Sequence, residues 1–395
     1  MQATIGMEAA FAEEEGFSSS RLGTIGEAMR RLDNQGKFAG VVSLLVRRGR
    51  VVHLEATGFS DLETRRPMDR DGIFRLASMT KPITSVAVMM LFEEGKFLLD
   101  DPIAEFLPEF GQAKVFLRES ANGVDVAELD RPITIRHLLM HTAGLRPYRN
   151  RENETLEEKV HQLASVPLAH QPGDGWTYGH STDVLGRLIE KISGLPLDRF
   201  FRERIFEPLE MSDTAFDVPR EKYARLARVY TPDEAGGLRY GETQNSDLSA
   251  PPIPPSASGS LVATATDYAR FCQMLLNGGS LGRERILGRK TIELMTANHT
   301  GAKRPFPPFP DFPIRNGLPC HPDEGQHRPP RTRAGSSHLD PPPQVRVQDP
   351  QFSPTARNGV SRRIRPRSSP PPGTVKIRVG CSTTSAMSGS TRYGA

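Results

Sequence analysis

The distribution of proline limits what this chain can fold into. Of the 34 prolines in its 395 residues, 18 lie in residues 302–395. Proline has no backbone N–H to donate, so the prolines within residues 305–313, 341–343 and 370–372 exclude a helix or a central strand at those places. A fold with a large apolar core must therefore be built from residues 1–301, and we expect residues 302–395 to be poorly ordered.

Charge divides the chain at the same place. Residues 302–395 carry 15 basic and 5 acidic side chains, whereas residues 1–301 carry 36 basic and 42 acidic ones. The formal net charge of +4 therefore hides a mildly acidic body. The basic segment has few aromatic side chains to stack on bases, so we expect no nucleic-acid partner. Within it, only residues 374–379 alternate apolar and polar side chains as a strand does.

Three observations bear on where the protein works. No apolar run approaches the roughly 18 residues of a membrane span. Residues 1–16 are acidic and lack the basic start and apolar core of a secretory signal. The three cysteines, Cys272, Cys320 and Cys381, form no CxxC pair. We therefore expect a cytoplasmic protein that has no membrane contact and needs no metal or cofactor.

Hydrophobic periodicity predicts helices and one hairpin in the body of the chain. The strongest helix carries Ile83, Val86, Ala87, Met90 and Leu91 on one face and ends at Gly95. A Pro/Ser-rich loop is expected over residues 246–260. The other predicted helices span residues 20–34, 132–141, 181–193, 266–277 and 286–298, and the hairpin joins strands 40–46 and 51–57.

The strongest chemical signal is Ser78-Met79-Thr80-Lys81, at the start of that apolar helix. A spacing of three places Ser78 and Lys81 on the same helical face, one turn apart. A lysine in this position can accept the serine proton, and the helix N-terminus favours an alkoxide or oxyanion. Taken alone, the pattern is also typical of a capping serine followed by an exposed lysine.

A second signal is Trp176-Thr177-Tyr178-Gly179-His180-Ser181, just before the helix predicted over residues 181–193. Tyr178 in this loop could approach Ser78 and Lys81 and carry their proton, since a phenolate beside cations is a competent base. The structural alternative is a half-buried tyrosine whose hydroxyl bonds to backbone.

Together these segments resemble a known family. Phe74-Arg75-Leu76-Ala77-Ser78-Met79-Thr80-Lys81-Pro82-Ile83 is similar to the nucleophile segment of family VIII carboxylesterases, serine hydrolases with the class C β-lactamase and DD-peptidase fold. The resemblance covers roughly residues 20–300. Further matching segments follow in the family's order, at residues 138–145, 171–173, 178–186, 205–211 and 260–268.

The resemblance implies an acyl-transfer mechanism with Ser78 as nucleophile and Lys81 and Tyr178 as the paired general base. The backbone N–H of Ser78 would be one oxyanion donor, and the second donor is unknown. The implied substrates are small molecules, short-chain acyl esters, with weak β-lactam hydrolysis left open. Gly179 and His180, in place of an asparagine two residues after the tyrosine, favour an esterase. The alternatives are a β-lactamase, a DD-peptidase, an acyltransferase or a catalytically impaired penicillin-binding-type protein.

The implied fold is of the α/β (α+β), β-lactamase-like class, with an antiparallel sheet flanked by helices and a mostly helical second domain. We expect the α/β domain to comprise residues 1–105 and 266–301, and the helical domain to comprise residues 106–265. Residues 302–395 would form the atypical Pro/Arg-rich tail. The active site would lie between the two domains.

The chain departs from the family at its third motif, a Lys-Thr-Gly, His-Thr-Gly or Trp-Gly-Gly on a strand lining the site. His299-Thr300-Gly301 has the right letters but follows directly on a predicted helix, so we interpret it as a helix terminus. The motif should fall within residues 302–395, where nothing matches. We hypothesise that this tail is translated in a shifted reading frame, which the nucleotide sequence would test.

Two further patterns favour structural roles over chemical ones. Gly278-Gly279-Ser280-Leu281-Gly282 matches the nucleophile elbow of α/β-hydrolases, but a predicted helix precedes it where the elbow needs a strand. A surface turn is therefore expected. His137, His141 and His161 have no metal-ligand spacing with carboxylates, so we expect structural roles for them.

Overall fold

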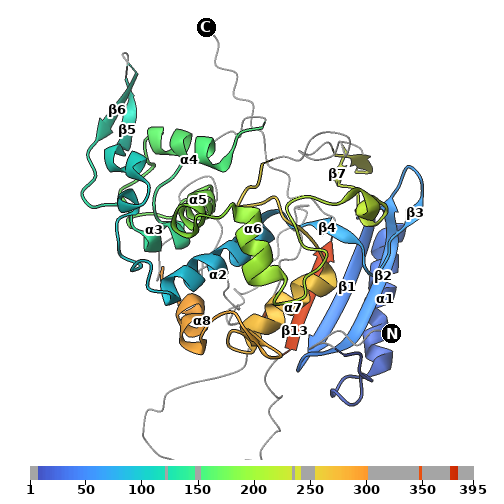
Figure 1. The fold of residues 1–395 in the computed structure, drawn as a ribbon. Helices are drawn as coiled ribbons and strands as arrows, with labels where there is room; N and C mark the ends of the chain where they lie inside the picture. Colours follow the sequence, from blue (N-terminus) through green and yellow to red (C-terminus); the bar gives the residue numbers. More distant parts are fainter. Residues whose placement is uncertain are drawn as a thin grey trace, which may run out of the picture.

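A computed structural model describes the greater part of the body of the chain (Figure 1). The described residues are 8–120, 123–146, 153–233, 236–241 and 254–300, together with the backbone of 347–348 and 374–380.

The centre of the main sheet is the predicted hairpin. β1 (Gly40–Arg47) and β2 (Arg50–Asp61) pair in antiparallel register and are joined by Arg48 and Gly49. Both connecting residues have positive φ, 52° and 77°, the two-residue turn whose twist matches that of its strands. The prediction of a hairpin is confirmed, and both strands are longer than the predicted ranges 40–46 and 51–57.

The free edge of β1 is covered by a strand from the proline-rich segment. β13 (Thr374–Gly380) is antiparallel to β1, with Val41 opposite Gly380 and Arg47 opposite Thr374. This confirms the strand that the alternation over residues 374–379 predicted. β12 (Val347–Gln348) and β3 (Arg66–Pro67) complete the sheet, whose strand order is β12-β13-β1-β2-β3.

Helices cover both faces of the sheet. α1 (Ser19–Asn34) begins at the capping residue Ser18 and packs on β2, while α7 (Ala265–Leu276) packs on β1 and β13 from the other side (Figure 1). Every residue of β1 is buried as a result. A strand buried on both faces has a continuous apolar sequence, as Val41, Val42, Leu44 and Leu45 show.

The helix that follows Ser78 is the central helix of the molecule. In α2 (Thr80–Glu93) every residue from Ile83 to Leu91 is buried, although the sequence predicted burial of one face only. A helix that is apolar all round must be enclosed, and α2 packs against α5 (Ser181–Ser193). The predicted bounds of α5 are confirmed, and Gly194 ends it with φ +70°.

The remaining helices are short. α6 continues directly into a π-helical turn at Arg202–Phe206, and α3 is shorter than predicted because Thr134 caps its start. 3-10 turns occur at Ala77–Met79, Ile103–Glu105, Pro108–Gln112 and Arg220–Arg225. The bounds of these helices are α3 Ile135–Leu139, α4 Leu156–Ser165, α6 Leu197–Phe201 and α8 Arg289–Thr296.

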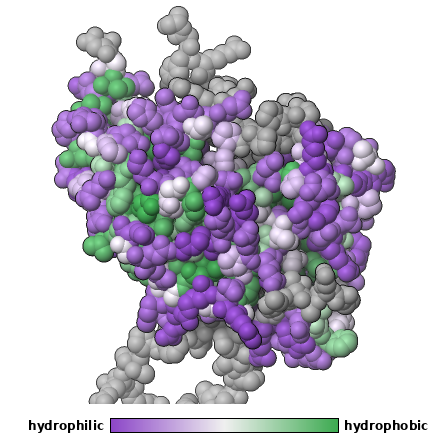
Figure 2. Space-filling view, viewed as in Figure 1, coloured by the Kyte–Doolittle hydropathy of each residue, from purple (hydrophilic) through white to green (hydrophobic). Residues whose placement is uncertain are grey.

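Several short strand pairs were not predicted from the sequence. They include a hairpin within residues 106–265, where we expected mostly helix. Leu117, Val124 and Val126 of this hairpin are exposed, and Figure 2 shows apolar surface at its position, upper left, on a largely polar face. The pairs are β4 (Ile73–Arg75) with β9 (Val262–Thr264), β5 (Val115–Ser120) with β6 (Gly123–Ala127), β7 (Tyr230–Pro232) with β8 (Leu238–Tyr240), and β10 (Ser280–Leu281) with β11 (Glu284–Arg285).

A single large apolar cluster joins the sheet to the helices. It runs from Val42 and Leu44 of β1 through Ile83 and Met89 of α2 to Leu188 of α5. Because one core connects these elements, the position of the sheet relative to α2 and α5 is fixed by packing.

Glycine in α5 allows this helix to pack tightly, which leads to a prediction. A Cβ added at Gly186 would lie 2.4 Å from the Cβ of Ala257, whereas one added at Gly23, on the exposed side of α1, would meet nothing within 4 Å. We expect Gly186→Ala to lower the free energy of unfolding by about 1–3 kcal/mol through overpacking. Gly23→Ala should raise it by up to about 1 kcal/mol, because alanine is the better helix former.

Urea denaturation of both variants and of the wild type measures these changes. Equal effects of the two substitutions would contradict the packing of α5 described above.

Candidate active site

The turn that carries Ser78 is strained and tied down. Ala77, the residue before it, has φ +46°, a conformation that costs free energy for a residue with a Cβ. The N–H of Leu76 donates to Leu261 O at 2.8 Å, and the hydroxyl of Tyr268 donates to Met79 O at 3.1 Å. Ser78 itself is exposed just before the N-terminus of α2. The fold thus presents this serine to solvent on a fixed backbone.

Lys81 lies behind the serine, as its spacing predicted. Its Nζ is 3.2 Å from Ser78 Oγ and donates to the backbone carbonyl of Ser258 at 2.8 Å. The lysine is only 6% exposed. Serine and lysine are therefore within proton-transfer distance, and the lysine is largely shielded from water.

Tyr178 is brought to the same place from a distant loop. The Nζ of Lys81 lies over its ring, 4.8 Å from the centroid. The ring stacks on Trp176 at 5.7 Å and is 38% exposed. The structure thus brings together Ser78, Lys81 and Tyr178, the three residues that the sequence singled out.

The loop that holds Tyr178 rests on a buried histidine. The N–H of Thr177 donates to His141 O at 2.9 Å, and the rings of His141 and Tyr178 lie 4.9 Å apart. His141 has φ +56°, a backbone conformation that is uncommon for a residue other than glycine. Its burial and the nearby charge of Lys81 lower its pKa to about 3, so the imidazole is neutral at ordinary pH.

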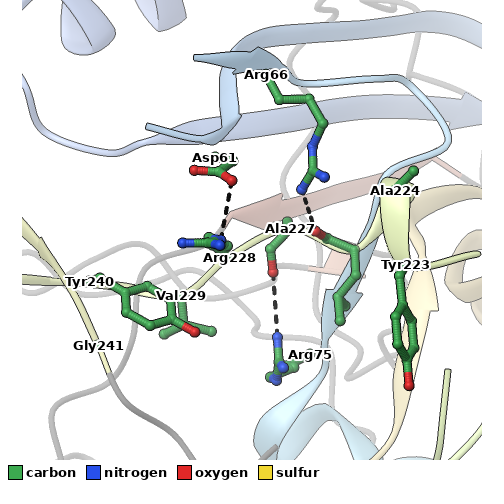
Figure 3. A pocket seen from close by; sticks show the side chains of 11 residues that line it. Asp61, Arg66, Arg75, Tyr223, Ala224, Ala227, Arg228, Val229, Tyr240 and Gly241 are labelled. Carbon is green, nitrogen blue, oxygen red and sulfur yellow. Dashed lines mark hydrogen bonds and ion pairs between the residues drawn. The ribbon is translucent and has the colours of Figure 1, made fainter. Parts of the chain in front are cut away.

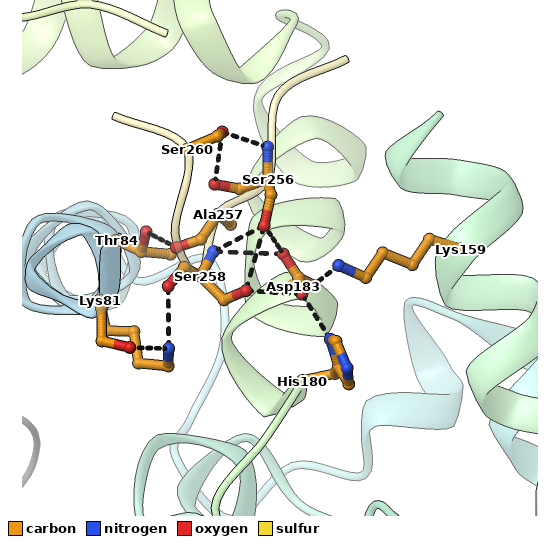
Figure 4. A network of polar contacts seen from close by, with 10 residues as sticks. Lys81, Thr84, Lys159, His180, Asp183, Ser256, Ala257, Ser258 and Ser260 are labelled. Carbon is orange, nitrogen blue, oxygen red and sulfur yellow. Dashed lines mark hydrogen bonds and ion pairs between the residues drawn. The ribbon is translucent and has the colours of Figure 1, made fainter. Parts of the chain in front are cut away.

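Two residues behind Lys81, Ser258 and Asp183, were not among the candidates predicted from the sequence. Lys81 donates to a carbonyl in the turn of residues 256–260, and this turn is bonded in turn to Asp183 on α5 (Figure 4). A backbone carbonyl is present in every residue, so Ser258 could not be singled out from the sequence. Asp183, in the first turn of a helix, is a common choice at that position whatever its role.

The third family motif is not found among the described residues. His299 Nε2 lies 2.6 Å from Leu294 O, and the N–H of Thr300 donates to Asn298 Oδ1 at 3.2 Å. Both residues follow the end of α8, so their assignment to a helix terminus is confirmed. The motif was expected within residues 302–395, of which 302–346, 349–373 and 381–395 lie outside the described part of the chain. The second oxyanion donor stays unassigned.

The alternative nucleophile Ser280 has the wrong surroundings. It starts β10, which follows α7 and turns back into β11 at Gly282. A nucleophile elbow needs a strand before the serine and a helix after it, so the interpretation as a turn is confirmed.

The other histidines and the cysteines that the sequence singled out lie on helices or outside the described residues. His137 closes the capping box of α3 with Thr134, and His161 is exposed on α4. Cys272 is buried and unbridged, while Cys320 and Cys381 lie outside the described residues. Within the described ranges, no group of three or more His, Cys, Asp or Glu side chains is arranged to hold a metal ion.

A separate arginine-lined pocket of about 220 Å³ lies beside β2 and β3 and contains none of the three candidate residues (Figure 3). Arg66 donates to Leu226 O at 3.1 Å, and Arg75 donates to Ala227 O at 3.4 Å. Arg228 pairs with Asp61 at 3.2 Å. These bonds connect β2, β3 and β4 to residues 226–228. The arginines of this pocket therefore have a structural role.

Comparison with known proteins agrees with this geometry. The family model described as Beta-lactamase matches residues 25–337. The chain belongs to the beta-lactamase family. Protein Rv1367c of Mycobacterium tuberculosis is 36% identical to it over 286 residues, 68% of this chain and 70% of that protein. Esterase EstB of Burkholderia gladioli is 32% identical over 225 residues, 52% of this chain and 54% of that protein.

A solved structure is similar as well. EstCE1, a hydrolase with promiscuous acyltransferase activity, has a TM-score of 0.61 and 28% identity, covering 72% of this chain and 80% of that one. This beta-lactamase-family chain is accordingly a serine hydrolase with a β-lactamase-like fold, as the resemblance to family VIII esterases implied. Over the described residues, none of its helices is both long and apolar enough to cross a membrane.

The buried imidazole of this serine hydrolase predicts a pH dependence of stability. His141 stays neutral in the folded state down to a pKa of about 3, whereas the unfolded chain takes up the proton near 6.5. Stability is therefore lost progressively as the pH falls between these two values. We expect His141→Asn, which tolerates positive φ, to lose less stability than the wild type between about pH 7 and about pH 5.

Thermal unfolding followed by circular dichroism at a series of pH values measures this difference. Parallel curves for the two proteins would show that His141 does not titrate as described.

Proposed function

We propose that the protein is a carboxylesterase that hydrolyses short-chain acyl esters through an acyl-enzyme on Ser78. The observation that carries this proposal is the 3.2 Å contact between Ser78 Oγ and the shielded Nζ of Lys81, with the serine open to solvent. The similarity to EstB, an esterase, and to EstCE1, a hydrolase, supports ester hydrolysis.

In the first half of the reaction, Ser78 Oγ attacks the ester carbonyl and forms the acyl–oxygen bond. Lys81 and Tyr178 take the proton from Oγ and deliver it to the leaving alcohol. The oxyanion of the tetrahedral intermediate is stabilised at the N-terminus of α2, where the N–H of Ser78 is one donor. The C–O bond to the alcohol breaks, and the acyl group remains on the serine.

In the second half, water attacks the acyl-enzyme with the same two side chains as base. The bond to Ser78 Oγ breaks, and the serine takes back its proton while the carboxylic acid leaves.

Because Ser78 is exposed, an alcohol can take the place of water, and the promiscuous acyltransferase activity of EstCE1 favours acyl transfer as a second candidate activity. Ester products formed on addition of a primary alcohol would support it, and hydrolysis alone would exclude it.

Substitution of the serine and the lysine tests the esterase proposal. We expect Ser78→Ala and Lys81→Met each to reduce kcat on p-nitrophenyl acetate and butyrate by about a thousandfold or more, because nucleophile and base act as one unit. Steady-state kinetics on these esters, and on a chromogenic cephalosporin, provide the measurement.

The matched control is Ser280→Ala, which removes a hydroxyl from the β10–β11 turn and should leave kcat unchanged. Activity that survives Ser78→Ala but is lost in Ser280→Ala would reject the assignment. Rapid cephalosporin turnover without ester turnover would identify a β-lactamase instead.

A further inference from the structure

A carboxylate on α5 is fully buried beside the site and takes no part in the steps above. Asp183 is 0% exposed, and its Oδ2 lies 2.7 Å from Lys159 Nζ and 3.0 Å from His180 Nδ1. Burial raises the pKa of Asp183, but the hydrogen bond from His180 and the charge of Lys159 outweigh it and leave the pKa below its usual range. Because a buried charge is costly unless its oxygens are well bonded, its other donors are informative.

Three of those donors come from a single turn. Ser256 Oγ and the N–H of Ser258 donate to Oδ1 of Asp183 at 2.8 and 3.2 Å, and Ser258 Oγ donates to Oδ2 at 2.8 Å. Figure 4 shows this turn between α2 and α5, with both serines directed at the carboxylate. The turn belongs to no helix or strand, so these bonds fix its position.

The other side of the turn faces α2. Thr84 Oγ1 donates to Ala257 O at 2.6 Å, and Lys81 Nζ donates to Ser258 O at 2.8 Å. In Ser258 the backbone N–H is therefore bound to α5 while the carbonyl is bound to the lysine. One residue links the buried carboxylate to Lys81.

A lysine side chain needs such a link for proton transfer. Its stem has four rotatable bonds, and an ammonium without a fixed acceptor samples many positions. The Ser258 carbonyl holds Nζ on one side and leaves it 3.2 Å from Ser78 Oγ on the other. Small misplacements of a reacting group are costly in rate, so the position of this carbonyl matters to the chemistry.

We propose that Asp183 is a positioning residue for Lys81: it anchors Ser256 and Ser258 so that the Ser258 carbonyl holds the lysine against Ser78. The inference rests on the proposed function, in which Lys81 takes the serine proton. Asp183 acts through the turn and touches neither substrate nor Ser78. The role predicts a loss in kcat with KM preserved, whereas a purely structural role predicts a loss in stability alone.

The test uses Asp183→Asn and the double variant Asp183→Asn/Lys159→Met, in which no buried ammonium is left without its counterion. We expect kcat on p-nitrophenyl butyrate to fall by about thirtyfold or more, with KM changed less than threefold, at a temperature at which each variant is folded. The rate at which a fluorophosphonate labels Ser78 should fall in parallel. Retention of both rates within threefold in the double variant would overturn the proposal.

The matched control is Asp61→Asn, the same chemical change at another buried carboxylate. Asp61, at the end of β2, is 3% exposed, accepts from the N–H groups of Glu63 and Thr64, and pairs with Arg228. We expect Asp61→Asn to lower Tm and leave kcat within threefold. An equal loss of kcat in Asp61→Asn would show that the effect of Asp183 is a general cost of losing a buried charge.

A further variant covers the case in which neither Asp183 variant folds. Ser256→Ala/Ser258→Ala removes two of the three donors and leaves Asp183 with Lys159, His180 and the backbone N–H of residue 258. We expect about a tenfold loss of kcat with KM preserved, and an unchanged kcat would overturn the proposal. Failure of the proposed function can be distinguished from failure of this inference. If the proposed function is wrong, wild type and Ser78→Ala hydrolyse esters at the same rate. The rate of fluorophosphonate labelling still reports on the position of Lys81.

Discussion

The side-chain nitrogen of Lys81 is held in a largely dry site between a nucleophile and a backbone carbonyl. It lies 3.2 Å from Ser78 Oγ and 2.8 Å from Ser258 O, with the side chain 6% exposed. Removing a polar amino group from water costs free energy unless it finds hydrogen-bond partners. The site therefore exists only when α2, which carries the lysine, and the turn of residues 256–260, which carries the carbonyl, are packed together correctly.

The architecture meets this requirement by enclosing α2. The helix is buried on nearly all sides and packs against α5, and its N-terminal turn is held by Leu261 and Tyr268. Lys81 and Ser258 are separated by 177 positions in the sequence. Contacts between such distant segments form only as the chain completes its fold, so proton transfer depends on the integrity of the whole core rather than on a local loop.

Much of this could be predicted from the sequence, because the signals concerned are local. The bounds of α5, the β1–β2 hairpin and the proximity of Ser78 to Lys81 follow from spacing within one segment. The approach of Tyr178 could be expected only through the resemblance to a family, since the loop and the helix lie far apart in the chain. Its ring contact with Lys81 is a property of the folded molecule.

Other features could not be predicted, for physical reasons. The Ser258 carbonyl has no side-chain signature, and the N-terminal turn of a helix is an ordinary place for Asp183. The β5–β6 hairpin is short and its Val124 and Val126 are exposed, so packing against the core does not specify it. Domain boundaries at residues 105 and 265 remain a prediction, because one apolar cluster crosses them.

The most direct measurement of the central claim is the site of the acyl group during turnover. The enzyme would be mixed with p-nitrophenyl butyrate, quenched in acid within the burst phase, digested and mapped by mass spectrometry. The account predicts a butyryl group on the peptide that contains Ser78 in the wild type, and none on that peptide in Ser78→Ala. A butyryl group on Ser280, or on any residue other than Ser78, in the wild-type protein would contradict it.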